Sequence, residues 1–219
     1  FKININFVFQ SALFMENKNY QEDLQHIRKM MEKSSRFISL SGISGVFAGL
    51  FALAGAIYVY FFFKKNGVDY FEGTVKYYEK DFIVHLVIVA MIIMVLAISS
   101  GAYFTIKKSK AHHLQIWDGT TKKLLYNFAI PLGIGGLFCA GLLYHGLHGL
   151  LSPATLIFYG LALFNAGNYT FSDIKYLGLC EMTLGIVSLF FLGYGLFFWA
   201  IGFGVLHIVY GIVMHKKYE

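Results

Sequence analysis

Six long apolar segments dominate this chain of 219 residues, and they constrain its fold more than any other feature. They cover residues 37–63, 82–106, 124–148, 151–167, 176–194 and 196–214. A helix needs about 20 mostly apolar residues to cross the hydrocarbon core of a bilayer. Only 14% of the residues are charged, whereas soluble proteins carry about 25%. The sequence therefore predicts an all-α integral membrane protein, with a bundle of six transmembrane helices over residues 37–215.

The basic residues predict the orientation of these spans. Thirteen lysines and arginines flank the spans on one side: Lys18, Arg28, Lys29, Lys33, Arg36, Lys107, Lys108, Lys110, Lys122, Lys123, Lys175, Lys216 and Lys217. The other side has four: Lys64, Lys65, Lys76 and Lys80. Because cytoplasmic loops of membrane proteins are enriched in Lys and Arg, we expect both termini, including the tail 216–219, in the cytoplasm. The expected location is the cell (inner) membrane.

Two segments precede the first span. Residues 1–14 have no basic start and no small-residue cleavage site, so they do not resemble a signal peptide. We expect them to be a non-native or upstream segment, with a native start at Met15. Residues 15–36 place Leu24, Ile27 and Met31 near helical spacing among charged residues. This pattern predicts a cytoplasmic amphipathic helix lying on the inner leaflet, and docking of a cytoplasmic protein partner is the alternative.

A short string recurs in three of the apolar segments. It reads GISGVF at 42–47, GIGGLF at 133–138 and GIVSLF at 185–190. These three spans run in the same direction, and each string begins several residues into its span. Three related hairpins would produce this arrangement. The alternative is chance, because Gly, Ile, Leu and Phe are abundant throughout these helices.

Small residues also recur at helical spacing, which lets helix backbones approach closely in lipid. Ser41, Gly45 and Gly49 form one such ladder. Similar faces are offered by Gly133, Gly136, Gly178, Gly185, Gly204 and Gly211. Because six spans already provide neighbours for these faces, the sequence favours packing within the bundle. A homodimer seam is the alternative.

Two ionisable residues of the last two spans are expected to meet. If these spans turn near residues 193–195, Glu181 lies at the same depth as position 208, next to His207. A lone carboxylate in hydrocarbon is costly, and a histidine offers it a hydrogen bond or a charge partner. The pair is interpreted either as a structural clasp or as a ligand or proton site. Asn165 and Asn168 belong to the same end and are expected to contribute to a polar inner cavity.

Three histidines are expected near the outer boundary of the membrane. His145 and His148 lie one helical turn apart, and His85 lies about one turn into the second span. Three imidazoles at one depth could bind zinc or copper, or two of them could ligate a haem. The alternative is that Gly146 and Gly149 end the helix there, with both rings at the headgroup level. The expected cofactor is none, with haem, zinc or copper as the alternatives.

Several function classes lack their sequence signatures. The chain has no HExxH zinc helix, no GxSxG elbow and no Walker loop. We therefore do not expect an enzyme. The formal net charge of +6 does not indicate nucleic-acid binding, because the basic residues flank apolar segments. Anionic lipid and membrane insertion explain that distribution better.

Three stretches carry a resemblance to a known family. They are IRKMMEKSSRFISLSGISGVFAG (27–49), FYGLALFNAGNYTFSDIKYLGLCEMTLG (158–185) and FWAIGFGVLHIVYG (198–211). With them the chain resembles a family of uncharacterised bacterial inner-membrane proteins along its length after residue 15. The resemblance implies six spans and no established activity, and it brings no catalytic residues to this sequence.

The sequence thus favours a non-enzymatic membrane protein, either a sensor or regulatory protein or one that binds a lipid or small ligand. Its partners would be the lipid bilayer and a cytoplasmic protein that contacts residues 15–36, with no nucleic acid. A small transporter that uses the Glu181 and His207 polar site is one alternative. A histidine-ligated metal or haem protein is the other.

Overall fold

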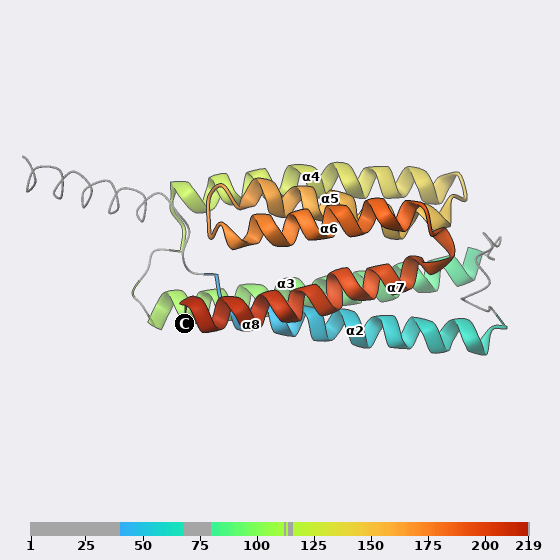
Figure 1. Cartoon of the computed structure of the whole chain (residues 1–219), viewed down its shortest axis with the longest axis horizontal. Coiled ribbons are helices and arrows are strands. Elements are labelled where there is room, and N and C mark those ends of the chain that lie inside the picture. The colour runs from blue at the N-terminus through green and yellow to red at the C-terminus, as the bar shows by residue number, and fades with distance from the viewer. Residues whose placement is uncertain (1–39, 68–79, 112, 114–115, 219) are drawn as a thin grey trace, which may run out of the picture. The chain divides into compact units, whose positions relative to one another are not determined.

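The computed structural model describes residues 40–67, 80–111, 113 and 116–218 (Figure 1). The regular elements of this part of the chain are all helical. The long helices are α2 (Gly42–Lys65), α3 (Lys80–Ala111), α4 (Gly119–Tyr144), α5 (Leu151–Ala166) and α6 (Asp173–Leu189). The last helical stretch comprises the 3-10 turn η3 (Leu192–Tyr194), α7 (Gly195–Trp199), the π-helical segment η4 (Ala200–Leu206) and α8 (His207–Tyr218). A second 3-10 turn, η2 (His148–Leu150), precedes α5. The segments 1–14 and 15–36 lie outside the described residues.

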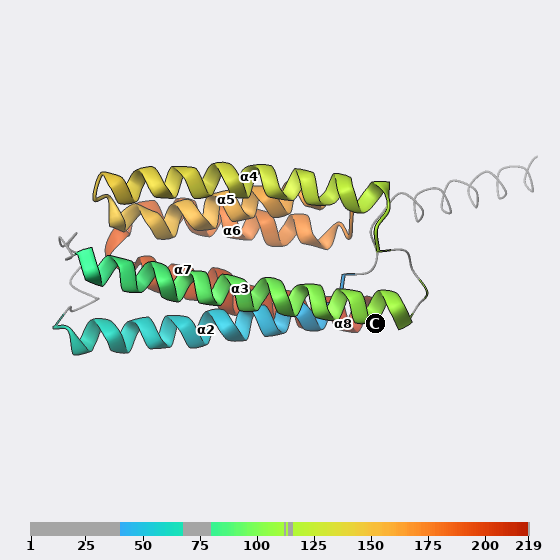
Figure 2. The same ribbon diagram turned by 180° about the vertical axis from the view of Figure 1, so that it is seen from behind.

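The described helices form two layers of three, seen from opposite sides in Figures 1 and 2. In one layer α5 packs between α4 and α6, and in the other α2 packs between α3 and the stretch from α7 to α8. The ends of α3 and α8 and the start of α4 lie at the same end of the bundle (Figure 1). We call this the basic end of the bundle, because it carries Lys107, Lys108, Lys110, Lys122, Lys123, Lys216 and Lys217.

Among the described residues, five helices are long and apolar enough to cross a membrane: Gly42–Lys65, Lys80–Ala111, Gly119–Tyr144, His148–Ala166 and Leu192–Tyr218. The remaining long helix, α6, corresponds to the fifth predicted span. It is apolar but has only 17 residues. It ends at Leu189 rather than at the predicted residue 194. The chain turns at Phe190 and Phe191, and the last helical stretch begins at Leu192.

The third helix also ends earlier than predicted. It ends at Tyr144 instead of residue 148, and His145 follows it as the C-cap. Gly146 adopts a positive φ of 71°, a backbone conformation that glycine tolerates and that commonly ends a helix. Of the two predictions for this stretch, the helix end is the one observed.

The glycines of α2 allow it to pack directly against the last helical stretch. A Cβ atom on Gly49 would lie 2.6 Å from the carbonyl oxygen of Gly204, and one on Gly211 would lie 2.6 Å from the backbone nitrogen of Val46. Neither position has room for a side chain. The predicted packing within the bundle is therefore confirmed for Gly49, Gly204 and Gly211.

The two glycines of α4 for which packing was predicted behave differently. A Cβ atom on Gly133 or Gly136 would meet no atom within 4 Å, so these positions do not support close packing within the chain as predicted. The recurring string is not at one depth either. GISGVF opens α2, GIGGLF lies in the middle of α4, and GIVSLF covers the last residues of α6. The string does not take the same position in each helix, so its placement does not support the predicted relation between three hairpins.

Candidate functional site

Glu181 of α6 and His207, the first residue of α8, lie side by side in the interior. His207 Nδ1 is 3.3 Å from Glu181 Oε1. Glu181 is 0% exposed and His207 is 6% exposed. The contact that the sequence predicts between these two residues is present, while its role as a ligand or proton site stays a prediction.

The ring of His207 is held by two further contacts. Its Nδ1 lies 3.0 Å from the carbonyl oxygen of Gly202, and its Nε2 lies 2.7 Å from the hydroxyl oxygen of Tyr159 on α5. A carbonyl oxygen only accepts, so Nδ1 carries a proton and donates it to Gly202. In the neutral ring, Nε2 then accepts the hydroxyl proton of Tyr159. These contacts fix both the orientation and the tautomer of His207.

A π-helical segment, η4, lies immediately before His207. Such segments are rare, and they frequently occur at functional sites. The helical side chain of His207 points back toward the N-terminus of its helix, which brings Nδ1 to the carbonyl of Gly202 five residues earlier. A Cβ atom on Gly202 would lie 2.5 Å from Glu181 Oε2. Glycine at this position therefore leaves the space that the carboxyl group occupies.

The carboxyl group of Glu181 has no hydrogen-bond partner in the described part of the chain. Both of its oxygens are buried, and neither accepts a hydrogen bond. His207 Nδ1 lies close to Oε1 of Glu181, but its N–H points to the carbonyl oxygen of Gly202. Burial of a carboxylate without hydrogen bonds costs several kcal/mol. The carboxyl oxygens of Glu181 are thus left without hydrogen bonds in the Glu181–His207 site.

Asn165 and Asn168 are not part of the Glu181–His207 site. They lie where α5 ends, and Asn168 is exposed, with its amide nitrogen donating to the backbone carbonyl of Asn165 at 3.2 Å. Neither residue hydrogen-bonds to Glu181 or His207. The prediction that they contribute to a polar inner cavity is not supported, because the turn after α5 satisfies its own polar groups.

The three predicted outer histidines do not form a metal site. His85 contacts the hydroxyl of Tyr58 through Nε2 at 2.9 Å and stacks on Phe62. His145 caps α4, and His148 opens the following 3-10 turn. Among the described residues, no group of three histidine, cysteine, aspartate or glutamate side chains is placed to hold a metal ion. The helix ends before His145, so His145 and His148 do not share the helical face on which the prediction depended.

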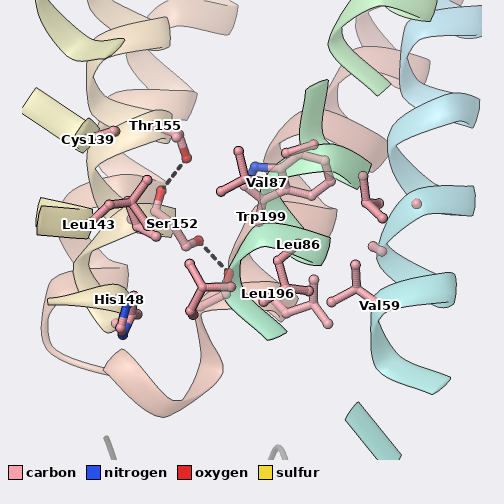
Figure 3. Close-up of a pocket in the computed structure, with 18 of the residues that line it drawn as sticks. Val59, Leu86, Val87, Cys139, Leu143, His148, Ser152, Thr155, Leu196 and Trp199 are labelled. Atoms are coloured by element: carbon pink, nitrogen blue, oxygen red, sulfur yellow. Dashed lines mark hydrogen bonds between the residues drawn. The ribbon is translucent and has the colours of Figure 1, made fainter. Parts of the chain in front are cut away.

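A cavity of about 450 Å³ lies between the two layers, toward the end opposite the basic end. Its volume falls in the range of small-molecule sites, roughly 300–1,000 Å³. Figure 3 shows Cys139, Leu143 and His148 on one side of it, facing Val59, Leu86 and Val87 on the other, with Leu196 and Trp199 between. None of its described lining residues is Asp, Glu, Lys or Arg.

Few polar groups reach the wall of this cavity. Ser152 Oγ donates to the carbonyl oxygen of Gly195 at 2.5 Å, and Thr155 Oγ1 donates to the carbonyl oxygen of Ser152 at 2.9 Å (Figure 3). Both hydroxyl protons are committed to the protein, so these oxygens remain available as acceptors only. The wall is therefore suited to a neutral, mostly apolar molecule that carries a hydrogen-bond donor.

Comparison with protein-family models, with curated proteins and with solved structures finds no match to this chain. The geometry adds three features that the sequence interpretation missed: the hydroxyl of Tyr159 beside His207, the π-helical segment, and the cavity. Tyr159 could have been found, because it lies in an apolar span at a depth near that of Glu181. The other two depend on how the helices pack, and no local sequence pattern reports them.

Proposed function

We propose that this chain is a six-span protein of the cell (inner) membrane, with both termini in the cytoplasm, that binds a neutral lipid-like molecule in the cavity between its layers. Its role would be that of a sensor or regulatory protein. Residues 15–36 would contact a cytoplasmic partner protein and signal to it whether the cavity holds a ligand. The clustering of lysines at the basic end supports this orientation, because positive residues favour the cytoplasmic side.

The observation that carries the proposal is the wall of the 450 Å³ cavity, whose described lining residues include no Asp, Glu, Lys or Arg. A charged ligand would lose its hydration there without gaining an ionic partner, which is strongly unfavourable. A neutral amphiphile would place its chain against Leu86, Val87 and Leu143. Its hydroxyl or amide group would donate to Ser152 or Thr155. Trp199 on the same wall provides a spectroscopic probe of occupancy.

The proposal can be tested by quenching the fluorescence of Trp199. The chain has two tryptophans, so Trp117→Phe leaves Trp199 as the single one. In nanodiscs, a long-chain alcohol brominated along its chain should quench Trp199 saturably, and an excess of the unbrominated alcohol should reverse the quenching. Val59→Phe, which fills the cavity, should abolish the saturable component. Ile57→Phe is the matched control, because Ile57 is on the same helix but 57% exposed and outside the cavity wall. Quenching that rises linearly and is unchanged in Val59→Phe would contradict the proposal.

A small transporter is the second candidate. It is favoured by the buried Glu181 and His207, because ionisable residues within a membrane span often mark ion or proton pathways. Uptake of a labelled solute into proteoliposomes that stops in Glu181→Gln would favour transport. Saturable binding without uptake would favour the sensor.

A further inference from the structure

Glu181 is the most unusual buried group in the described part of the chain. The residue is 0% exposed, and neither carboxyl oxygen accepts a hydrogen bond. Structural acids inside a protein are normally hydrogen-bonded or paired. Here the paired group, His207, directs its nearer N–H at a backbone carbonyl instead.

The surroundings of Glu181 restrict what could bind there. Among the described residues no three-ligand metal group is found, and Glu181 does not line the 450 Å³ cavity. Gly202 packs directly against the carboxyl group. A proton is the one ligand that needs no additional space.

We propose that Glu181 and His207 form a proton-binding site, and that its protonation is coupled through the π-helical segment Ala200–Leu206 to occupancy of the cavity. The first part stands on the buried pair alone. The coupling rests on the function proposed above.

The two protonation states differ in where one N–H points. In the protonated state the His207 imidazolium lies beside the Glu181 carboxylate, and its Nε2–H donates to the Tyr159 oxygen. On release, the Nε2–H bond breaks and the proton passes to the Tyr159 oxygen, the original hydroxyl proton of Tyr159 leaves to water at the basic end, and the new Tyr159 O–H donates back to Nε2. Because a charged donor and a charged acceptor form the stronger hydrogen bond, Nδ1–H turns to Glu181 and releases Gly202 in the protonated state, whereas in the neutral ring it donates to Gly202.

The onward route leads toward the basic end. Tyr159 and Tyr210 both pack against the cluster of Leu163, Ile174 and Leu177. The buried hydroxyl of Tyr210 has no hydrogen-bond partner among the described residues. At the surface, Asp173 accepts hydrogen bonds from Tyr218 at 2.6 Å and from Lys217 at 3.0 Å.

Few ionisable groups face the pair. The elements packed on α6 are α5, η3, α7, η4 and α8. Of these, α5 contributes Tyr159 and α8 contributes His207 itself, with Tyr210 one turn farther on. Helix α2 packs on α8 and η4 around His207. The remaining ionisable side chains on all these elements lie toward the helix ends: Tyr58, Tyr60, Lys64, Lys65, Tyr194, His215, Lys216, Lys217 and Tyr218. The protonation of the pair is thus set mainly by Glu181, His207 and Tyr159.

The coupling follows from the position of the π-helical segment. It begins directly after Trp199 of the cavity wall and ends directly before His207. Release of the Gly202 carbonyl favours a different hydrogen-bond register in this segment. A change of register moves Trp199 relative to His207, so ligand affinity and protonation depend on each other reciprocally.

The proton site can be tested by solid-state ¹⁵N NMR of histidine-labelled protein, with His207→Gln to assign the ring signals. We expect the His207 ring to change from two protonated nitrogens to one as the pH is raised. In Glu181→Gln the transition should move to lower pH by at least ~1 unit, because the negative neighbour is lost. Asp118→Asn, which removes an acid at the basic end, should leave it in place. A ring that keeps one protonation state in the wild type overturns the proposal even if Glu181→Gln does not fold.

The coupling is tested separately, with the uncharged brominated alcohol and the single Trp199. Its affinity should differ at least ~5-fold between the two protonation states, and Glu181→Gln should abolish this difference while Asp118→Asn retains it. Equal affinity at both pH values contradicts the coupling. Absence of saturable binding at any pH contradicts the proposed function, while the NMR titration still decides the proton site.

Discussion

His207 Nδ1 has two acceptors within reach, the carbonyl oxygen of Gly202 at 3.0 Å and Oε1 of Glu181 at 3.3 Å. One N–H thus lies close to both the backbone of the π-helical segment and a buried carboxyl group, and it donates to the backbone. This relationship joins helix α6 to the last helical stretch of the chain. It also means that a change at either residue alters the hydrogen bonding of the other.

The pairing predicts non-additive effects of substitution. Glu181→Gln and His207→Gln should each change stability, and the double variant should differ from the sum of the two by about 0.5–3 kcal/mol. Residues in direct contact show such coupling because each single change alters the environment of the other side chain. Denaturant unfolding in detergent measures the cycle. Additivity within about 0.3–0.5 kcal/mol would argue against an energetic interaction.

The close packing of α2 predicts a strong effect at one glycine and little at another. Gly49→Ala should destabilise the protein by about 1–3 kcal/mol, because the added methyl group meets the carbonyl of Gly204. Gly133→Ala is the matched control. Its Cβ meets no atom within 4 Å, so it should stabilise the helix by up to about 1 kcal/mol. Thermal unfolding of both variants checks this, and equal effects would contradict the described contact between α2 and the π-helical segment.

The N-cap of α4 predicts a loss of stability in acid. Asp118 accepts a hydrogen bond from the backbone N–H of Thr121 at 2.7 Å and another from its hydroxyl at 2.8 Å. These bonds, the backbone one above all, hold the pKa of Asp118 below its ordinary value of 3.8, although burial opposes them. Because the native pKa is depressed, the stabilisation is present above that ordinary value and is lost as the pH falls through the native pKa.

Two variants separate the charge of this cap from its geometry. At neutral pH, Asp118→Ala should cost about 1 kcal/mol, and the difference from the wild type should shrink as the acid is protonated. Asp118→Asn keeps an acceptor that does not titrate, so it should retain most of the cap and lose the pH dependence. Unfolding midpoints recorded across the acidic range test both. A constant gap between the wild type and Asp118→Ala would show that Asp118 does not cap through its charge.

The proposed orientation predicts opposite labelling of two helix ends. With Cys139 and Cys180 replaced by alanine, Asn66→Cys lies after α2 and Lys110→Cys lies near the end of α3, at the basic end. A membrane-impermeant maleimide added to intact cells should label the first and not the second. After permeabilisation both should react. Labelling of both positions in intact cells would overturn the topology.

The sequence predicts much of the helical framework because apolar length and glycine spacing are local features. It also predicts the contact of Glu181 with His207, although the turn lies at Phe190 and Phe191 rather than near residues 193–195. The two residues still meet because the long glutamate side chain and the ring of His207, which points toward the start of its helix, bridge the distance between their backbone positions. Position 202 was not expected to face the carboxyl group.

The remaining errors have identifiable causes. The predicted set of His85, His145 and His148 assumed that one helix continues to residue 148, whereas Gly146 at positive φ ends it. Asn165 and Asn168 were assigned by depth alone, and the turn after α5 uses their polar groups locally. The cavity arises because two three-helix layers do not meet fully between α3 and α4. A property of that kind depends on packing between distant segments and leaves no signature in any one of them.

Native mass spectrometry of the protein released from nanodiscs tests the central claim most directly, because it detects and weighs what the cavity holds. We predict one neutral lipid-like molecule per chain, retained in Ile57→Phe and lost in Val59→Phe. A wild-type spectrum without bound ligand, or with bound lipid that Val59→Phe does not remove, would contradict binding in the cavity.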